Sequence, residues 1–220
     1  MKKYTVTQFL LLALVLTAGC KKNDNSPSYI LKEDFPSMYL LPGKDWKFFN
    51  NNAPNITAQW MQGSSGSKVN LNGFPARSYK NSEDEYAFIS GYYAYVTGPA
   101  DISSWMITPS VTVKNGDIIQ FYTRSSNQPG SIDRLQLLLN ETSYSYDVGN
   151  TPVSVGVFTK ILLDINANQT PGGFPAEWTL NSVTISGLNG TLQTRLAFRY
   201  VVSGITASGI GVDEFSITRK

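Results

Sequence analysis

The chain repeatedly alternates apolar and polar residues over short stretches, and this alternation is the main structural signal of its sequence. Residues 192–202 show it most clearly, since Leu, Thr, Leu, Phe, Tyr and Val occupy every second position. A period of two is typical of a β-strand with one buried face, and the other face is expected to be partly solvated by Arg195 and Arg199. A strand of this kind usually pairs with antiparallel neighbours.

Further stretches predict strands of the same type. Residues 134–140 place leucines on one face, and the Asn115-Gly116 pair is a tight-turn dipeptide that predicts a hairpin between residues 111–113 and 117–123. Additional strands are expected near residues 31–35, 46–49, 87–95, 103–108, 158–163, 178–185 and 210–218. About ten short strands separated by turns indicate an all-β fold in which two antiparallel sheets pack as a β-sandwich.

Residues 1–28 differ in composition from the rest of the chain. A basic start, MKK, is followed by an apolar run at residues 9–16, which is too short to span a bilayer, and by the letters TAGC at 17–20. This order predicts a secretory signal peptide at residues 1–19. Cys20 is the only cysteine, and its position resembles the lipobox of bacterial lipoproteins, in which the cysteine carries a diacylglycerol.

Several acyl chains on Cys20 would anchor the mature protein stably to a membrane without spanning it. We therefore expect an outer-membrane lipoprotein that faces the periplasm or the cell surface. Residues 20–28 are expected to form its lipidated tether, and residues 29–220 a single sandwich domain. The alternative is that Cys20 is an ordinary residue beside a plain signal-peptide cleavage site.

Charge and residue content exclude several functions. Loss of residues 1–19 leaves 16 basic against 16 acidic residues, with no basic cluster beyond Lys21-Lys22, so nucleic acid is not an expected partner. The chain has no histidine, and its one thiol is expected to be acylated, which removes imidazole and thiolate catalysis and the nitrogen and sulfur ligands of zinc. We expect no enzymatic activity. A glycoside hydrolase that uses two carboxylates is the remaining enzymatic alternative.

Two acidic residues are expected to point inward. Strand alternation places Glu33 on the same side as Phe35, and Asp213 on the same side as Phe215 and Ile217. A carboxylate in an apolar interior needs a partner. If the first and last strands are neighbours, Glu33 and Asp213 could share a hard cation such as Ca²⁺. The alternative is that each is solvated at a strand end or pairs with a lysine or an arginine.

Several motifs together resemble a known family. In chain order they are EDF at 33–35, DW at 45–46, GYYAYV at 91–96, SSWMITPSVTVKNGDIIQFYTRS at 103–125, DRLQLLL at 133–139 and GIGVDEFSI at 209–217. This set is similar to the cleaved-adhesin, or choice-of-anchor J, family of Bacteroidetes-type surface proteins. The resemblance implies a jelly-roll sandwich related to MAM and galactose-binding-like domains, without shared catalytic residues. It also implies that the Trp-x-Ile-Thr-Pro element belongs to the fold, so we expect Trp105 to pack inside the domain.

The resemblance further implies a structural Ca²⁺ near the chain ends, with Glu33 and Asp213 as ligands. This chain departs from the family pattern at two places. It has Glu214 where a second aspartate is common, and Lys44-Asp45 where a glycine is more usual.

These expectations lead to a binding function. We expect a lipid-anchored, non-catalytic surface binding or adhesion module, with a glycan or a surface protein as its partner. Residues 141–157 form a long loop, expected at an end of the sandwich, where binding loops are common. Tyr144 and Tyr146 in this loop, and Tyr92 on a nearby strand, are the candidate ligand contacts because a tyrosine ring offers a flat apolar face with a polar tip. The alternative is a structural subunit of an outer-membrane assembly that binds only proteins.

Overall fold

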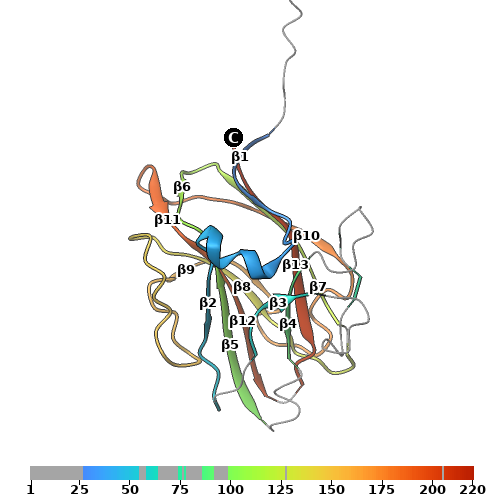
Figure 1. Ribbon diagram of the computed structural model, residues 1–220. Coiled ribbons are helices and arrows are strands. Elements are labelled where there is room, and N and C mark those ends of the chain that lie inside the picture. Colours follow the sequence, from blue (N-terminus) through green and yellow to red (C-terminus); the bar gives the residue numbers. More distant parts are fainter. Residues whose placement is uncertain are drawn as a thin grey trace, which may run out of the picture.

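The computed structural model describes residues 27–54, 58–63, 74–75, 77, 86–91, 99–126, 128–204 and 206–220. Their regular structure consists of β-strands and two short 3-10 helices, η1 (Met38–Leu40) and η2 (Pro42–Lys44) (Figure 1). The strands are β1 (Ser28–Glu33), β2 (Lys47–Asn50), β3 (Met61–Gln62), β4 (Ala87–Ser90), β5 (Ala100–Ile107), β6 (Val111–Val113), β7 (Ile118–Ser125), β8 (Leu135–Leu139), β9 (Lys160–Ile165), β10 (Thr179–Thr184), β11 (Leu192–Thr194), β12 (Leu196–Gly204) and β13 (Gly209–Arg219). Within these ranges, no helix has the length and apolar character needed to cross a membrane.

The strands form two large sheets. The first has the order β10-β7-β13-β4-β3, with β1 also paired to β13, and the second has the order β2-β5-β12-β8-β9. Strands β11 and β6 make a small separate sheet. Every one of these pairings is antiparallel. The predicted fold class, an antiparallel β-sandwich, is therefore confirmed.

The main hydrophobic core lies between the two large sheets. Phe198 of β12 packs edge-on against Phe121 of β7, with 5.0 Å between ring centroids, and against Phe215 of β13 at 5.3 Å. All three rings are fully buried. Burying one such ring contributes about 1.5–3 kcal/mol to stability. The apolar positions of the alternating strands are thus the positions that fill this core.

The predicted hairpin between residues 111–113 and 117–123 is wrong in its pairing, although its turn is present. The Asp117 N–H donates to the Lys114 carbonyl (3.2 Å), and Gly116 has the positive φ of 94° that favours glycine. However, Gly116 N–H donates to the Ile185 carbonyl (2.9 Å), and Ile185 N–H donates to the Asp117 carbonyl (2.8 Å). These bonds join the turn to the end of β10, so β7 pairs with β10 and β13, while β6 pairs with β11.

The predicted strand at residues 192–202 is divided at Arg195 into β11 and β12. Arg195 and Arg199 are each only 5% exposed, so the prediction that they are solvated is wrong. The reason is the segment of residues 141–157, called the covering loop below. It packs onto the outer face of the second sheet, where both arginines lie, and removes them from solvent.

The covering loop makes a second, smaller core on that outer face. The sheet contributes the buried residues Trp105, Ile107, Leu138 and Ala197, and Val148 of the loop and Phe158 after it pack against them. Phe49 of β2 packs against the same cluster. The loop, yellow in Figure 1, therefore lies along the face of the second sheet. The expectation that it projects from an end of the sandwich is wrong.

Trp105 is fully buried in this second core, which confirms the prediction that it packs inside the domain. Its indole N–H donates to Ser103 Oγ (3.1 Å), and its ring lies 5.0 Å from the Arg199 guanidinium, at a distance typical of a cation–π contact. Arg199 also donates to the Pro152 carbonyl of the covering loop. Strand β5 ends at Ile107, before Pro109, as expected for a residue without an N–H donor.

Candidate functional site

The covering loop is fixed by amide side chains at both of its sides. Asn140 Oδ1 accepts the backbone N–H of Ser143 (3.1 Å), and its Nδ2 donates to the Ser145 carbonyl (3.1 Å). On the other side, Asn51, the residue directly after β2, donates its Nδ2 to the Gly149 carbonyl (3.0 Å). A loop held by such bonds loses less conformational freedom when it binds a ligand, which favours affinity.

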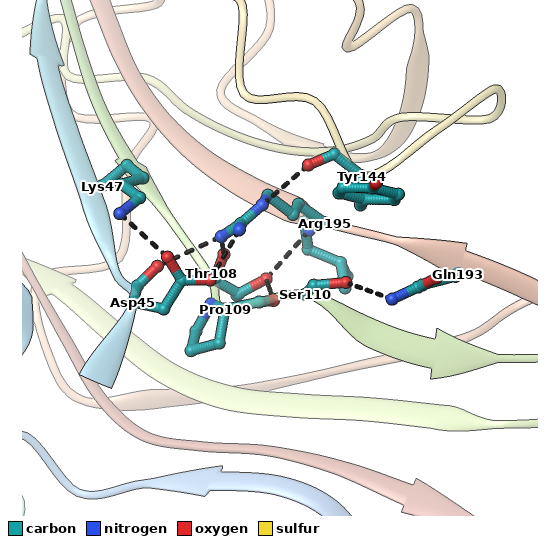
Figure 2. Close-up of polar contacts among 9 residues, drawn as sticks. Asp45, Lys47, Thr108, Pro109, Ser110, Tyr144, Gln193 and Arg195 are labelled. Carbon is teal, nitrogen blue, oxygen red and sulfur yellow. Dashed lines mark hydrogen bonds and ion pairs between the residues drawn. The ribbon is translucent and has the colours of Figure 1, made fainter. Parts of the chain in front are cut away.

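Arg195 connects the loop to two other parts of the chain (Figure 2). Its Nε donates to the Tyr144 carbonyl of the loop (2.8 Å), and one terminal nitrogen donates to the Thr108 carbonyl after β5 (2.8 Å). The other terminal nitrogen binds Asp45 Oδ2 (2.6 Å), while Lys47 Nζ binds Asp45 Oδ1 (2.8 Å). The hydrogen bonds from Lys47 and Arg195 lower the pKa of Asp45, so this carboxylate is ionised between two cations.

The two tyrosines predicted as ligand contacts are exposed next to this network. Tyr144 is 58% exposed and Tyr146 is 46% exposed. The Tyr146 ring stacks on Phe49 of β2, with 5.9 Å between centroids and 20° between ring planes. The Arg195 guanidinium and Lys47 Nζ lie 5.6 Å and 5.7 Å from the Tyr146 centroid. Tyr146 is thus held in position by neighbours while a large part of its surface faces solvent.

A shallow, open hollow of ≈ 420 Å³ adjoins the Tyr146 ring. Its lining residues are Phe49, Ser145, Tyr146, Asp147, Val148 and Gly149. Aromatic and polar residues thus line the hollow together, and the polar groups also hold the loop, since Asp147 Oδ1 accepts the Gly149 N–H (2.8 Å) and Ser145 Oγ the Asp147 N–H (3.4 Å). Its volume lies in the usual range for small-ligand sites, about 300–1,000 Å³. It can accept a flat, partly apolar molecule that also carries hydroxyl groups.

The sequence predicts part of this site. It named Tyr144 and Tyr146, which the structure places on the same exposed stretch of loop. It missed Phe49, although two adjacent phenylalanines in one short strand are a signal that both faces of that strand are covered. It also missed Arg195, which alternation placed in solvent. Of the other predicted site residues, Tyr92 and the lipidation site Cys20 lie outside the described residues.

Glu33 and Asp213 lie on neighbouring strands, the arrangement that a shared cation would require. Strands β1 and β13 are antiparallel, with Glu33 opposite Phe215. Glu33 is 5% exposed and Asp213 is fully buried, so both are removed from solvent. A bulge in β13 after Asp213 shifts the alternation, because Val212 and Phe215 both face the main core. The prediction that Asp213 lies on the same side as Phe215 and Ile217 is therefore wrong. Glu33 has partners of its own, because its carboxylate accepts the Phe35 N–H (3.1 Å) and binds Lys44 Nζ (3.0 Å).

Asp213 is also engaged, through backbone donors. Its two oxygens accept the N–H of Glu214 (2.7 Å) and the N–H of Arg77 (3.1 Å). Burial raises its pKa to about 7, and the two backbone hydrogen bonds oppose that rise. Across the described ranges, no three or more His, Cys, Asp or Glu side chains are grouped so as to hold a metal ion. One carboxylate is thus bound by a lysine ammonium and the other by two backbone N–H groups. This arrangement does not fit the Ca²⁺ ion that the sequence resemblance implies.

Comparisons with known proteins identify the fold. Neither the protein-family models nor the curated proteins contain a match to this chain. Among solved structures, the K3 cleaved adhesin domain of Lys-gingipain from Porphyromonas gingivalis W83 is 18% identical, with a TM-score of 0.58, over 88% of this chain and 99% of that one. The K1 domain of the same protein is 17% identical, with a TM-score of 0.57, over 86% of this chain and 98% of that one.

The K2 cleaved adhesin domain of Lys-gingipain is similar at the same level, with 14% identity and a TM-score of 0.56 over 86% of this chain and 99% of that one. Identities this low show a shared fold and do not transfer a ligand or a site. The chain therefore has the β-sandwich fold of the cleaved adhesin domains.

Proposed function

We propose that this protein is a lipid-anchored, non-catalytic binding module of the bacterial outer membrane, and that it recognises a glycan through the covering loop. The observation that carries the proposal is the placement of Tyr146. Its ring is fixed by Phe49 and Arg195, nearly half of its surface is exposed, and it borders an open hollow of ≈ 420 Å³. A rigid exposed aromatic ring is a recognition element that needs little ordering on binding.

The chemistry of the hollow supports a sugar as the ligand. One face of a sugar ring presents C–H groups, which pack on an aromatic face, while its hydroxyl groups require hydrogen-bond partners at the edge. The exposed part of Tyr146 supplies aromatic surface, and Ser145 and Asp147 line the same hollow. Asp45 neutralises part of the charge of Lys47 and Arg195, so the surroundings do not demand an anionic ligand.

A glycan array is the first test of this proposal. The purified protein is expected to bind a restricted set of neutral oligosaccharides, and the Tyr146→Ala variant is expected to lose those signals. Tyr39→Ala is the matched control, because Tyr39 is 90% exposed on η1 and lies outside the hollow. Silence of the wild-type protein across the array, together with capture of a protein from an outer-membrane extract, would contradict glycan recognition.

The lipid anchor rests on the sequence around Cys20 and has its own test. In a bacterial host with lipoprotein processing, wild-type protein is expected in the membrane fraction, and Cys20→Ala is expected in the soluble fraction because no acyl chain can then be attached. The measurement is an immunoblot of both fractions, with labelling by a fatty acid as a second readout. Equal membrane association of both proteins would contradict an anchor at Cys20.

A second candidate function is supported by a separate surface. Tyr39 and Leu40 project from η1 with exposures of 90% and 56%, while Leu41 next to them is fully buried. Large contiguous apolar patches mark protein contact sites, and Tyr39 and Leu40 would be the centre of such a contact. This surface favours the structural-subunit alternative, in which the protein joins an outer-membrane assembly. Loss of a captured protein in Tyr39→Ala, but not in Tyr146→Ala, would support that function over glycan binding.

A further inference from the structure

The carboxylate of Glu33 is buried next to Lys44, a lysine whose side chain is about half exposed. Only 5% of the Glu33 side chain is exposed, and both of its oxygens have donors. Oε1 accepts the N–H of Phe35 (3.1 Å), and Oε2 binds Lys44 Nζ (3.0 Å). An ionised carboxylate away from water is stable only when it is paired and hydrogen-bonded. Lys44 supplies the charge that Glu33 requires.

Lys44 is held in place by the chain on both sides of it. It is the last residue of η2, and its N–H donates to the Leu41 carbonyl (2.9 Å). The N–H of Trp46 donates to the same carbonyl (3.1 Å), and the side chains of Leu41 and Trp46 are buried in the main core. Two buried anchors therefore fix the backbone from which the lysine reaches Glu33.

Aromatic rings of the main core surround Glu33. The Trp46 ring packs edge-on against Phe35 at 5.6 Å and lies at 6.0 Å from Phe215, the residue opposite Glu33 on β13. Glu33, Lys44 and these rings thus join β1, η2 and β13 at one place. Removal of the Lys44 charge would leave the buried Glu33 carboxylate without its ion pair beside this aromatic cluster.

We propose that the chain supplies its own cation at this place, and that the Lys44 ammonium occupies the position at Glu33 that a divalent ion would need. Lys44 satisfies Glu33 directly, and Asp213 is satisfied separately by backbone N–H groups of Arg77 and Glu214. The two carboxylates share no partner among the bonds of the described residues. The domain is therefore stable without Ca²⁺, and the Lys44–Glu33 pair connects β1 to η2 in its place.

Thermal unfolding in chelator and in calcium tests the first part of the proposal. Tm of the wild-type protein is expected to be the same in EDTA and in CaCl₂ at matched ionic strength, because a ligand raises Tm only when it binds the folded state. A lower Tm in EDTA, or a rise in CaCl₂ that disappears in Glu33→Gln, would overturn the proposal.

Substitution of Lys44 tests the second part. Lys44→Met is expected to lower Tm by about 2–4 °C, and Lys44→Arg, which keeps the charge, to retain most of the wild-type value. The combined Lys44→Met and Glu33→Gln changes should cost less than the sum of the two single changes, since the residues are in contact. Lys32→Met is the matched control because Lys32 and Lys44 are equally exposed, at 49% and 52%, whereas the Asp34 carboxylate that Lys32 binds is 48% exposed and the Glu33 carboxylate only 5%. An exposed pair contributes little, so Lys32→Met should leave Tm unchanged. Equal effects of Lys44→Met and Lys32→Met would contradict the proposed role of Lys44.

Discussion

Replacement of Trp105 by alanine is expected to lower the free energy of unfolding by about 3–5 kcal/mol. The indole is fully buried in the second core, between the outer face of the second sheet and the covering loop. Its removal leaves a cavity, an Arg199 guanidinium without its aromatic neighbour, and a loop with a smaller apolar base. Denaturant unfolding of wild type and Trp105→Ala measures the difference.

Two comparisons make the Trp105 result specific. Trp105→Phe keeps an aromatic ring in the site and is expected to cost less than Trp105→Ala. Tyr39→Ala removes an aromatic ring that is 90% exposed and is expected to change stability by no more than about 0.5 kcal/mol. If Trp105→Ala abolished ligand binding without a loss of stability, Trp105 would belong to the ligand site and not to the core.

Replacement of Asp133 by alanine is expected to cost at least about 3 kcal/mol of stability, because each buried donor left without an acceptor costs about 1–3 kcal/mol. The Asp133 carboxylate is fully buried and accepts hydrogen bonds from the Tyr200 hydroxyl, the Ser208 hydroxyl and the backbone N–H groups of Ser208 (3.0 Å) and Gly209 (3.1 Å). Burial raises its pKa, and these donors oppose the rise. The carboxylate joins β12 to the start of β13.

The matched control for Asp133 is an exposed aspartate with the same kind of bond. Asp101 accepts a hydrogen bond from the Ser203 hydroxyl (2.5 Å) in an exposed position, so water can replace it and Asp101→Ala should change stability by no more than about 0.5 kcal/mol. Thermal and denaturant unfolding of both variants provide the measurement. Similar losses for Asp101→Ala and Asp133→Ala would show that the buried network does not stabilise the fold as described.

The alternation of apolar residues predicted the sandwich and its main core because that core is built from one face of each strand. It failed for the outer face of the second sheet. Arg195 and Arg199 occupy positions that are polar in the pattern, yet the covering loop buries them. Arg195 binds Tyr144, 51 positions earlier in the chain, and Arg199 binds Pro152, 47 positions earlier. A period of two carries no information about such distant cover.

The sequence nevertheless contains a local signal that the outer face of the second sheet is buried. Phe48 packs against the main core and Phe49 against the second core, so adjacent apolar residues of β2 face opposite ways. The same holds for Met106 and Trp105 in β5. Consecutive large apolar residues in a strand indicate that both of its faces are buried. The hairpin prediction failed for a different reason, since a turn dipeptide determines the turn and leaves open which strands pair after it.

The predicted tyrosines were found because loop aromatics are visible in the sequence, whereas their supports depend on the tertiary structure. Phe49, Lys47 and Arg195 contact Tyr146 from β2 and from the junction of β11 and β12. Those contacts follow from the packing of the covering loop on the second sheet. They also make the central claim testable, because Tyr146 is exposed and can be replaced without opening a core.

The most direct test is a calorimetric titration of the protein with an oligosaccharide identified on the array, comparing wild type, Tyr146→Ala and Tyr39→Ala. Truncation of a central aromatic contact is expected to raise Kd about tenfold or more, which corresponds to a loss of about 1.4 kcal/mol. Tyr39→Ala is expected to leave Kd unchanged, and both variants are expected to remain folded. An unchanged Kd in Tyr146→Ala, or equal losses in the two variants, would contradict recognition through the covering loop.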